Sequence, residues 1–254
     1  MNPIVIKNLV KKFGPVTAIS DLSLEIEAHE IFALLGPDGS GKTTTSRILA
    51  AVMDPTGGEA KVASFDVRRE SEKIKEKIGY MPQAFGLYPD LSIEENIDFY
   101  ADIYGISRRD RLPRMNRLLD FTGLAPFVKR LAGRLSGGMK QKLALTCALI
   151  HTPEILILDE PTLGVDPVSR REFWKLLYEL LKDGATILVT TSYMDEAQRC
   201  NRAGLLHRGR LIACDKPDSI RSQVRDLTNN TVTPSLEDAF IFLIKRSEDS
   251  DGRV

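Results

Sequence analysis

The run of glycines and polar residues from Gly36 to Thr43 has the composition and spacing of a phosphate-binding loop. It reads Gly-Pro-Asp-Gly-Ser-Gly-Lys-Thr and fits the pattern GxxxxGKT. Such a pattern is expected by chance in about 1% of chains of this length. Glycines let consecutive backbone N–H groups turn inward around an anion, and a helix that follows adds the partial positive charge of its N-terminus. We therefore predict that this loop holds phosphate groups between a strand at residues 31–35 and a helix from about residue 42.

The side chains of the loop suit a nucleotide with Mg²⁺. Lys42 would reach the β- and γ-phosphates, and the Thr43 hydroxyl would hold the metal ion. A plain glycine-rich turn with a solvated lysine is the alternative, and the motifs below weaken it. The nucleotide-binding residues that we predict here are Gly36, Pro37, Asp38, Gly39, Ser40, Gly41, Lys42, Thr43 and Thr44.

Two carboxylates, Asp159 and Glu160, end an apolar run that begins at Ile155. The run fits a central parallel strand, and ligands of such sheets bind at the carboxyl ends of the strands. Asp159 suits the shell of Mg²⁺ through water, and Glu160 would orient or deprotonate a water that attacks the γ-phosphate. Two solvated acids at a strand end are the ordinary alternative. The phosphate loop earlier in the chain favours the functional interpretation.

A third segment, Leu135–Gln141, reads Leu-Ser-Gly-Gly-Met-Lys-Gln and precedes a run of good helix formers. Ser136 would cap this helix, and its hydroxyl and the N–H groups of the two glycines would face an anion. By itself the segment could be a simple glycine-containing helix start. One chain rarely needs two unlike cradles for a γ-phosphate, whereas two chains arranged head-to-tail would use both together.

These motifs, in this order, make the chain resemble the ATP-binding subunit of ABC transporters over about residues 3–245. The resemblance implies that Phe13 stacks on adenine, although a core phenylalanine is the alternative. It also implies that Gln83, in Tyr-Met-Pro-Gln, joins two subdomains and touches Mg²⁺ and water. Asp166, in Gly-Val-Asp, would lie in a loop at the dimer interface. The residues that would face the ATP of a partner subunit are Ser136, Gly137, Gly138 and Met139.

The segments after Gln83, at 191–197 and at 234–240 are most similar to bacterial ABC-2 exporters of the drug-resistance type. This resemblance implies ATP and Mg²⁺ as cofactors, and Thr43, Gln83 and Asp159 as the metal site. It also implies two kinds of partner, an integral-membrane permease and a second ATP-binding subunit in a homodimer or heterodimer, and no nucleic acid. The chain would then power drug or small-molecule efflux, bound through the permease to the cytoplasmic face of the cell membrane.

One position departs from the family pattern. After the strand at 186–190, the family usually has a histidine that contacts the γ-phosphate, and this chain has Ser192 there. A hydroxyl is shorter than an imidazole and cannot carry its positive charge. We therefore hypothesise that the chain's own site hydrolyses ATP slowly, with Glu160, Gln83 and Ser192 as its catalytic set. Asp38, where asparagine is usual, and Met139, where glutamine is commoner, are smaller departures whose effects stay open.

The rest of the sequence must position these groups. The chain has 254 residues, a net charge of zero and 43% hydrophobic residues, and no apolar run approaches the length of a membrane span. Three cysteines without a CxxC motif suggest no disulfide framework, so we expect a cytosolic protein. Ser92–Glu95 is a capping-box pattern that predicts a helix through about Tyr104.

Alternating strands and helices predict an α/β fold, a P-loop NTPase core with an antiparallel β subdomain and an inserted helical subdomain. We expect the core in residues 1–83 and 154–220, and the helical signature subdomain in residues 84–153. The tail, 221–254, would contain one amphipathic helix and be disordered from residue 247.

Two other functions remain open. A soluble ABC-type ATPase acting on nucleic acid or ribosomes would share the motifs. It is disfavoured by the balanced charge and by the short interval between Gln83 and Ser136, which has no room for a long coiled coil. A P-loop kinase or GTPase would share the phosphate loop but would not need the segment from Ser136 to Gly138.

Overall fold

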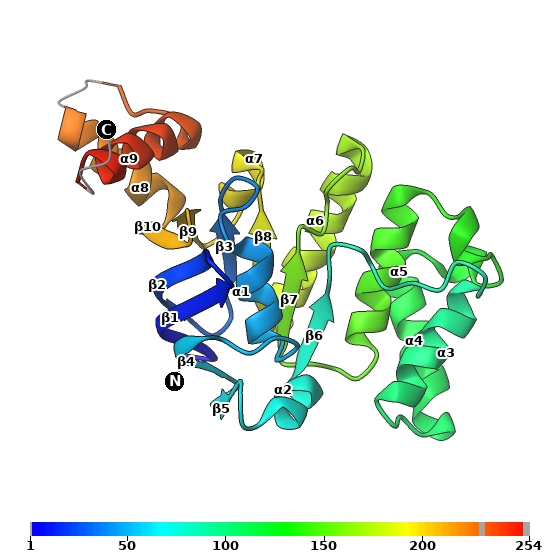
Figure 1. Ribbon diagram of the computed structural model, residues 1–254. Helices are drawn as coiled ribbons and strands as arrows, with labels where there is room; N and C mark the ends of the chain where they lie inside the picture. Colours follow the sequence, from blue (N-terminus) through cyan, green and yellow to red (C-terminus); the bar gives the residue numbers. More distant parts are fainter. Residues whose placement is uncertain (1, 229–231, 251–254) are drawn as a thin grey trace.

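The computed structural model describes residues 2–228 and 232–250. A sheet with the strand order β10-β9-β3-β8-β7-β6 forms its centre (Figure 1). Neighbouring strands run parallel, except β10, which is antiparallel to β9. The predicted α/β fold is confirmed. The strands are β3 (Ile31–Leu35), β6 (Ile78–Met81), β7 (Ile155–Asp159), β8 (Thr186–Thr191), β9 (Arg202–His207) and β10 (Arg210–Asp215).

The middle strands of this sheet are buried on both faces, as their uninterrupted apolar runs indicate. Helix α6 (Pro167–Lys182) covers one face, where Trp174 shares a core cluster with Leu156 of β7. Helix α1 (Lys42–Leu49) covers the other, in a cluster that contains Ile157 of β7. Alternate residues of β7 therefore pack against a helix on each face, which fixes the position of the carboxylates at the end of the strand.

A second sheet, with the strand order β2-β1-β4-β5, is antiparallel throughout. Ile4 and Ile6 of β1 share a core cluster with Ile48 and Leu49 of α1. Helix α1 thus packs between the two sheets, and this packing sets the direction of its N-terminus. The strands are β1 (Ile4–Phe13), β2 (Val16–Ile26), β4 (Gly57–Val62) and β5 (Phe65–Asp66).

Helices follow β6 and precede β7, to one side of the central sheet (Figure 1). Ser92 caps the first of them as its pattern predicts: Ser92 Oγ accepts the N–H of Glu95 at 3.2 Å, and Glu95 Oε2 accepts the N–H of Ser92 at 2.7 Å. The boundaries 84–153 for this subdomain stay a prediction. The helices are α2 (Ser71–Lys77) before β6, and α3 (Ile93–Ile103), α4 (Arg108–Thr122), the 3-10 turns Ala125–Phe127 and Ala132–Arg134, and α5 (Gly137–Leu149) after it.

The C-terminal segment contains one helix more than we predicted. A short helix α7 (Met194–Ala197) follows β8, and two longer ones, α8 (Pro217–Thr228) and α9 (Leu236–Ser250), follow β10. The single helix predicted in 221–254 and the disorder predicted from 247 were therefore wrong, because buried apolar side chains on one face of α8 pack with α9 against the central core. The part of the predicted tail at 251–254 lies outside the described residues. Across residues 2–228 and 232–250, no helix is both long and apolar enough to cross a bilayer.

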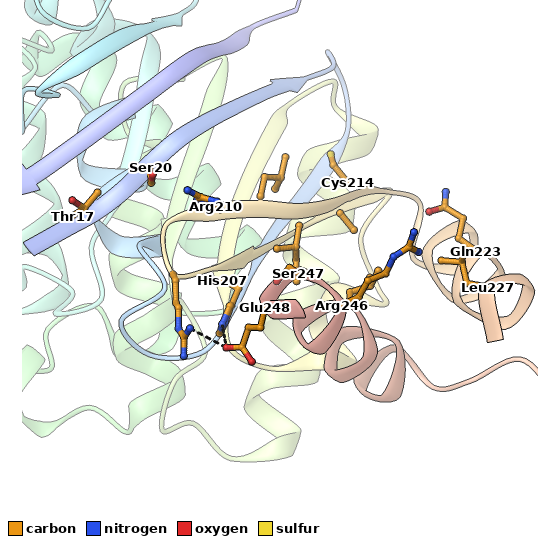
Figure 2. Close-up of a pocket in the computed structure, with 15 residues that line it drawn as sticks. Thr17, Ser20, His207, Arg210, Cys214, Gln223, Leu227, Arg246, Ser247 and Glu248 are labelled. Carbon is orange, nitrogen blue, oxygen red and sulfur yellow. Dashed lines mark ion pairs between the residues drawn. The ribbon is translucent and has the colours of Figure 1, made fainter. Parts of the chain in front are cut away.

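The C-terminal helices α8 and α9 pack against each other and against β10. A cavity of about 830 Å³ lies between β10 and the C-terminal helices, and no residue of the loop lines it. Figure 2 shows Glu248 of α9 pointing toward His207 at the turn between β9 and β10. Glu248 Oε1 lies 3.0 Å from Arg208 Nη1 and 3.6 Å from His207 Nε2. The next residue of the turn, Gly209, donates its N–H to the carbonyl oxygen of Ser40 at 2.9 Å.

We expect Ser92→Ala to lower the free energy of unfolding by about 1 kcal/mol, because it removes the hydroxyl that caps α3. Urea denaturation followed by circular dichroism measures the change. Ser71→Ala is the matched control, since Ser71 begins α2 and its side chain caps no backbone N–H. Equal stability of the Ser92→Ala variant and the wild-type chain would contradict the capping role.

Candidate nucleotide-binding site

The predicted phosphate loop connects the central strand β3 to the N-terminus of α1. Gly36 follows β3 and donates its N–H to the carbonyl oxygen of Thr191 at the end of β8, at 3.3 Å. A Cβ on Gly36 would lie 2.3 Å from the carbonyl oxygen of Leu206, so only glycine fits there. Gly41 has a φ of 110°, which is a left-handed conformation that favours glycine. The structure thus forms the strand-loop-helix arrangement that a phosphate cradle requires.

The ammonium group of Lys42 lies inside the loop and pairs with Glu160. Lys42 Nζ donates to the carbonyl oxygens of Gly36 at 2.8 Å and Pro37 at 3.1 Å. It also lies 3.0 Å from Glu160 Oε1, and both side chains are almost completely buried. Asp38 is exposed, with its Oδ1 4.0 Å from Lys42 Nζ. The positive charge of the loop is therefore balanced, in this structure, by the predicted catalytic carboxylate.

Asp159 is held by two hydroxyl groups, one from the neighbouring strand β8 and one from the first turn of α1. Its Oδ1 accepts hydrogen bonds from Thr190 Oγ1 at 2.6 Å and from Thr43 Oγ1 at 3.2 Å. Its Oδ2 is buried and has no hydrogen-bond partner among the described residues. A buried carboxylate oxygen without a donor is costly unless a cation or an ordered water takes the place. Thr43 and Asp159, both predicted as metal-site residues, thus lie together and fit a hard divalent cation.

Glu160 has a strained backbone and two side-chain partners. Its φ is 47°, which is unusual for a residue with a Cβ, and its N–H donates to the carbonyl oxygen and to Oγ1 of Thr190. Such strain is found mainly where the surroundings fix a functional group. Its Oε1 faces Lys42, and Ser192 Oγ donates to its Oε2 at 3.3 Å. The predicted pair of Glu160 and Ser192 is therefore in contact.

Thr190 contributes to this site and was missed by the sequence analysis. It holds the side chain of Asp159 and the backbone of Glu160. The only signal in the sequence is a threonine near the end of a strand, which is too common to single out. Its role depends on the register that pairs Asp159 with Thr190 across β7 and β8, and a single sequence does not reveal strand pairing.

Gln83 and Phe13 are not part of this cluster. Gln83 is exposed and follows Met81, the last residue of β6, by two positions. Met81 pairs in parallel with Leu158 of β7, so Gln83 lies at the same edge of the sheet as Glu160. Phe13 ends β1 with 47% of its surface exposed, and Lys11 Nζ lies 5.0 Å from its ring centroid. The alternative that Phe13 is a core residue is wrong. An exposed aromatic ring is available for stacking.

The second predicted cradle lies at the start of α5. Ser136 Oγ accepts the N–H of Met139 at 3.3 Å and caps the helix, and both Ser136 and Gly137 are exposed. A Cβ on Gly138 would lie 2.4 Å from Ser169 Oγ of α6, so the two helices are in close contact at this point.

Asp166 begins the neighbouring helix α6. Its Oδ1 accepts the N–H groups of Val168 and Ser169 at 3.0 Å each, and these bonds lower the pKa of Asp166. Among the described residues, no hydrogen bond or ion pair joins the segment Ser136–Met139 to the phosphate loop of the same chain. Asp166 and this segment therefore lie close together, apart from the cluster around Lys42.

The chain matches the family described as ABC transporter over residues 19–163. It is 42% identical over 238 residues to the "Probable multidrug ABC transporter ATP-binding protein YbhF" of Escherichia coli (strain K12), covering 94% of this chain and 41% of that protein. It is 34% identical over 241 residues to the "Linearmycin resistance ATP-binding protein LnrL" of Bacillus subtilis (strain 168), covering 94% of this chain and 78% of that protein. The chain thus spans about two fifths of the length of the first of these relatives.

Solved structures of similar proteins share the fold. One is described as "Structure of ATP binding subunit of ABC transporter", with a TM-score of 0.82, 28% identity, and coverage of 95% of this chain and 99% of that chain. Another is the dimeric structure of an ATP-binding cassette in a post-hydrolysis state, bound to ADP and Pi. It has a TM-score of 0.76, 28% identity, and coverage of 84% of this chain and 98% of that chain.

Two glycines of the loop provide a matched test of its geometry. Gly41 and Gly39 both have positive φ, but a Cβ on Gly41 would lie 2.6 Å from the carbonyl oxygen of Ala18, whereas a Cβ on Gly39 would have no neighbour within 4 Å. We expect Gly41→Ala to weaken ATP binding roughly tenfold more than Gly39→Ala. Both place an alanine at positive φ, but only the first also brings the new Cβ against the backbone of Ala18. Isothermal titration calorimetry measures both affinities. Equal losses in the two variants would contradict this account.

Proposed function

The chain belongs to the ABC transporter family of ATP-binding proteins, and from this we propose that it binds and hydrolyses ATP to power an ABC exporter for drugs or other small molecules. The observation that carries the proposal is the meeting of Lys42, Asp159, Glu160 and Ser192 at one edge of the central sheet. The proposed direction and cargo follow the names of the relatives, which act in multidrug transport and linearmycin resistance.

The phosphate groups of ATP would bind the backbone N–H groups of residues 36–44 and the ammonium of Lys42. Mg²⁺ would be held by Thr43, Asp159 and Gln83, and when bound it would neutralise charge on the phosphate oxygens. The unpartnered Oδ2 of Asp159 supports this assignment. Phe13, exposed at the end of β1, would stack on the adenine ring.

Glu160 would act on the attacking water once Lys42 moves to the nucleotide. In this structure Lys42 Nζ lies 3.0 Å from Glu160 Oε1, so the carboxylate is engaged by a cation. A γ-phosphate that takes up Lys42 would leave Glu160 Oε1 available to orient a water and accept its proton. Ser192 Oγ would keep its contact with Oε2 and hold the carboxylate in place. Glu160 would then be able to act on water only after the nucleotide has bound and taken up Lys42.

The segment Ser136–Met139 would bind the ATP of a second ATP-binding subunit. Its helix start is exposed and separate from the chain's own phosphate loop, which suits a head-to-tail dimer with two ATP molecules between the subunits. A similar cassette is described as dimeric in a post-hydrolysis state with ADP and Pi, which supports dimerisation of this chain. Asp166 would lie at this interface. ATP would favour the closed dimer, and hydrolysis would release it.

The remaining partner would be an integral-membrane permease, which would hold the chain at the cytoplasmic face of the membrane. The residues from Phe85 to Tyr88, at the junction with the helical subdomain, would receive the permease, and Tyr88 is 44% exposed. The net charge of zero supports a protein partner without nucleic acid. An ATPase acting on nucleic acid or ribosomes is the less supported function.

We expect Glu160→Gln to accumulate as an ATP-bound dimer, because it removes the proton acceptor but keeps the shape of the site. Size-exclusion chromatography with light scattering at saturating MgATP measures the mass. The double variant with Lys42→Ala is the control, since it removes the ammonium needed for the phosphates and should stay monomeric. A Glu160→Gln chain that stays monomeric would contradict a homodimer and would require a second, different ATP-binding subunit.

We expect Ser192→His to raise the ATPase rate by roughly tenfold or more, because an oriented imidazole stabilises the transferring phosphoryl group where a serine does not reach. Steady-state phosphate release from the purified chain measures the rate. Ser192→Ala is the control and should give no increase. Equal rates for Ser192→His and the wild-type chain would contradict slow hydrolysis at the chain's own site.

A further inference from the structure

We propose that Glu196 is a positioning residue that sets the placement of Glu160 and Ser192 relative to each other. The proposal rests on the hydrolytic role proposed above for Glu160. Glu196 lies on the short helix α7, and its side chain is only 1% exposed. A buried carboxylate needs several hydrogen-bond donors to offset its desolvation. The bonds that it accepts then hold the donor side chains in place around it.

The carboxylate of Glu196 joins two loops that are distant in the sequence. Its Oε1 accepts a short hydrogen bond from Thr162 Oγ1, and its Oε2 accepts one from Thr191 Oγ1 at 2.7 Å. Thr162 lies two residues after Glu160, and Thr191 directly precedes Ser192. Glu160 and Ser192 are thus each no more than two residues along the chain from a threonine whose hydroxyl donates to Glu196. The contact between Ser192 Oγ and Glu160 Oε2, at 3.3 Å, spans the same two loops.

Thr191 extends this link to the phosphate loop. Its carbonyl oxygen accepts the N–H of Gly36 at 3.3 Å, while its hydroxyl is committed to Glu196 and also accepts the N–H of Tyr193 at 3.0 Å. The carbonyl oxygen of Gly36 in turn accepts from Lys42. The bond to Gly36 uses the backbone carbonyl of Thr191, whereas the bond to Glu196 uses its hydroxyl. Loss of the Glu196 contact would therefore release Ser192 while Thr191 keeps its bond to the phosphate loop.

The charge of Glu196 is balanced locally. Arg170 Nε lies 3.8 Å from Glu196 Oε1, and the Arg170 guanidinium stacks 4.3 Å from the ring centroid of Tyr193. Arg170 Nη1 also lies 3.7 Å from Asp195, whose side chain is 55% exposed. Asp195 is thus a matched acid that shares the same cation but has no hydrogen bond to Thr162 or Thr191 among the described residues.

The chain contains one tryptophan, and it belongs to this cluster. Trp174 Nε1 donates to Glu196 Oε1 at 3.4 Å, and the indole is buried in the central core. The emission of an indole responds to a charge beside its N–H. Intrinsic fluorescence therefore reports whether the negative charge of Glu196 lies beside the indole, and this measurement does not require ATP hydrolysis.

The test compares Glu196→Gln with the control Asp195→Asn, each in the full chain. We expect Glu196→Gln to shift the Trp174 emission, to keep the affinity for ATP within twofold, and to lower single-turnover hydrolysis by about ten- to a hundredfold, as a displacement near 1 Å does in other active sites. In the Glu160→Gln background, Glu196→Gln should add no further loss. Asp195→Asn should leave emission, affinity and rate unchanged.

Thr162→Val is the second variant, in case Glu196→Gln unfolds the chain. It removes the hydroxyl donor at nearly constant shape and should lower the rate at unchanged ATP affinity, whereas Thr162→Ser should retain the rate. A rate lost in Glu160→Gln but kept in both Glu196→Gln and Thr162→Val would overturn the positioning role alone. Parallel losses of thermal stability, affinity and rate in Glu196→Gln, with a wild-type rate in Thr162→Val, would also overturn it. An unchanged rate in Glu160→Gln would overturn the proposed hydrolytic role itself.

Discussion

The pairing of β8 with β3 on one side and β7 on the other is the constraint on which the site depends. Parallel pairing brings the carboxyl ends of the three strands to one edge, with Leu35 opposite Thr191 and Asp159 opposite Thr190. The phosphate loop follows β3, and the acidic pair lies at the end of β7. A slip of one residue would turn Asp159 toward the opposite face of the sheet. The apolar runs of the three strands, buried on both faces, oppose such a slip.

The second constraint is the balance of buried charge. Lys42 and Glu160 are removed from water together, and each has hydrogen-bond partners besides the other. Glu196 is buried in the same way, with hydroxyl and indole donors and with Arg170 nearby. Removing one member of such a pair is far more costly than replacing both, because an isolated buried charge remains. These charges and their hydrogen bonds therefore hold the loops in place at the edge of the sheet.

The sequence predicted the parts of the site that are local and missed those that depend on pairing. The loop from Gly36, the acids Asp159 and Glu160, and the cap at Ser136 are each contiguous patterns whose main residues have a physical reason that can be read locally. Thr190 and Glu196 are not, since their roles arise only when β8 lies beside β7 and α7 packs against β3 and β8. Helix α8 was missed for a related reason. Its polar composition conceals an apolar face that is useful only against the core and α9.

The charges at the sheet edge also bear on the form in which a nucleotide would bind. Lys42 contributes one positive charge, while Asp159 and Glu160 contribute two negative ones, so the buried groups carry a net negative charge. The N-terminus of α1 adds only about half a positive charge. A nucleotide without a cation would bring several negative phosphate charges to this edge of the sheet, where the two carboxylates would repel them. The unpartnered Oδ2 of Asp159 is where a divalent cation would offset that repulsion, and Lys42 would then be free to leave Glu160 for the phosphate. The same arrangement of charge would thus favour a cation-bound nucleotide and would link its arrival to the release of Glu160.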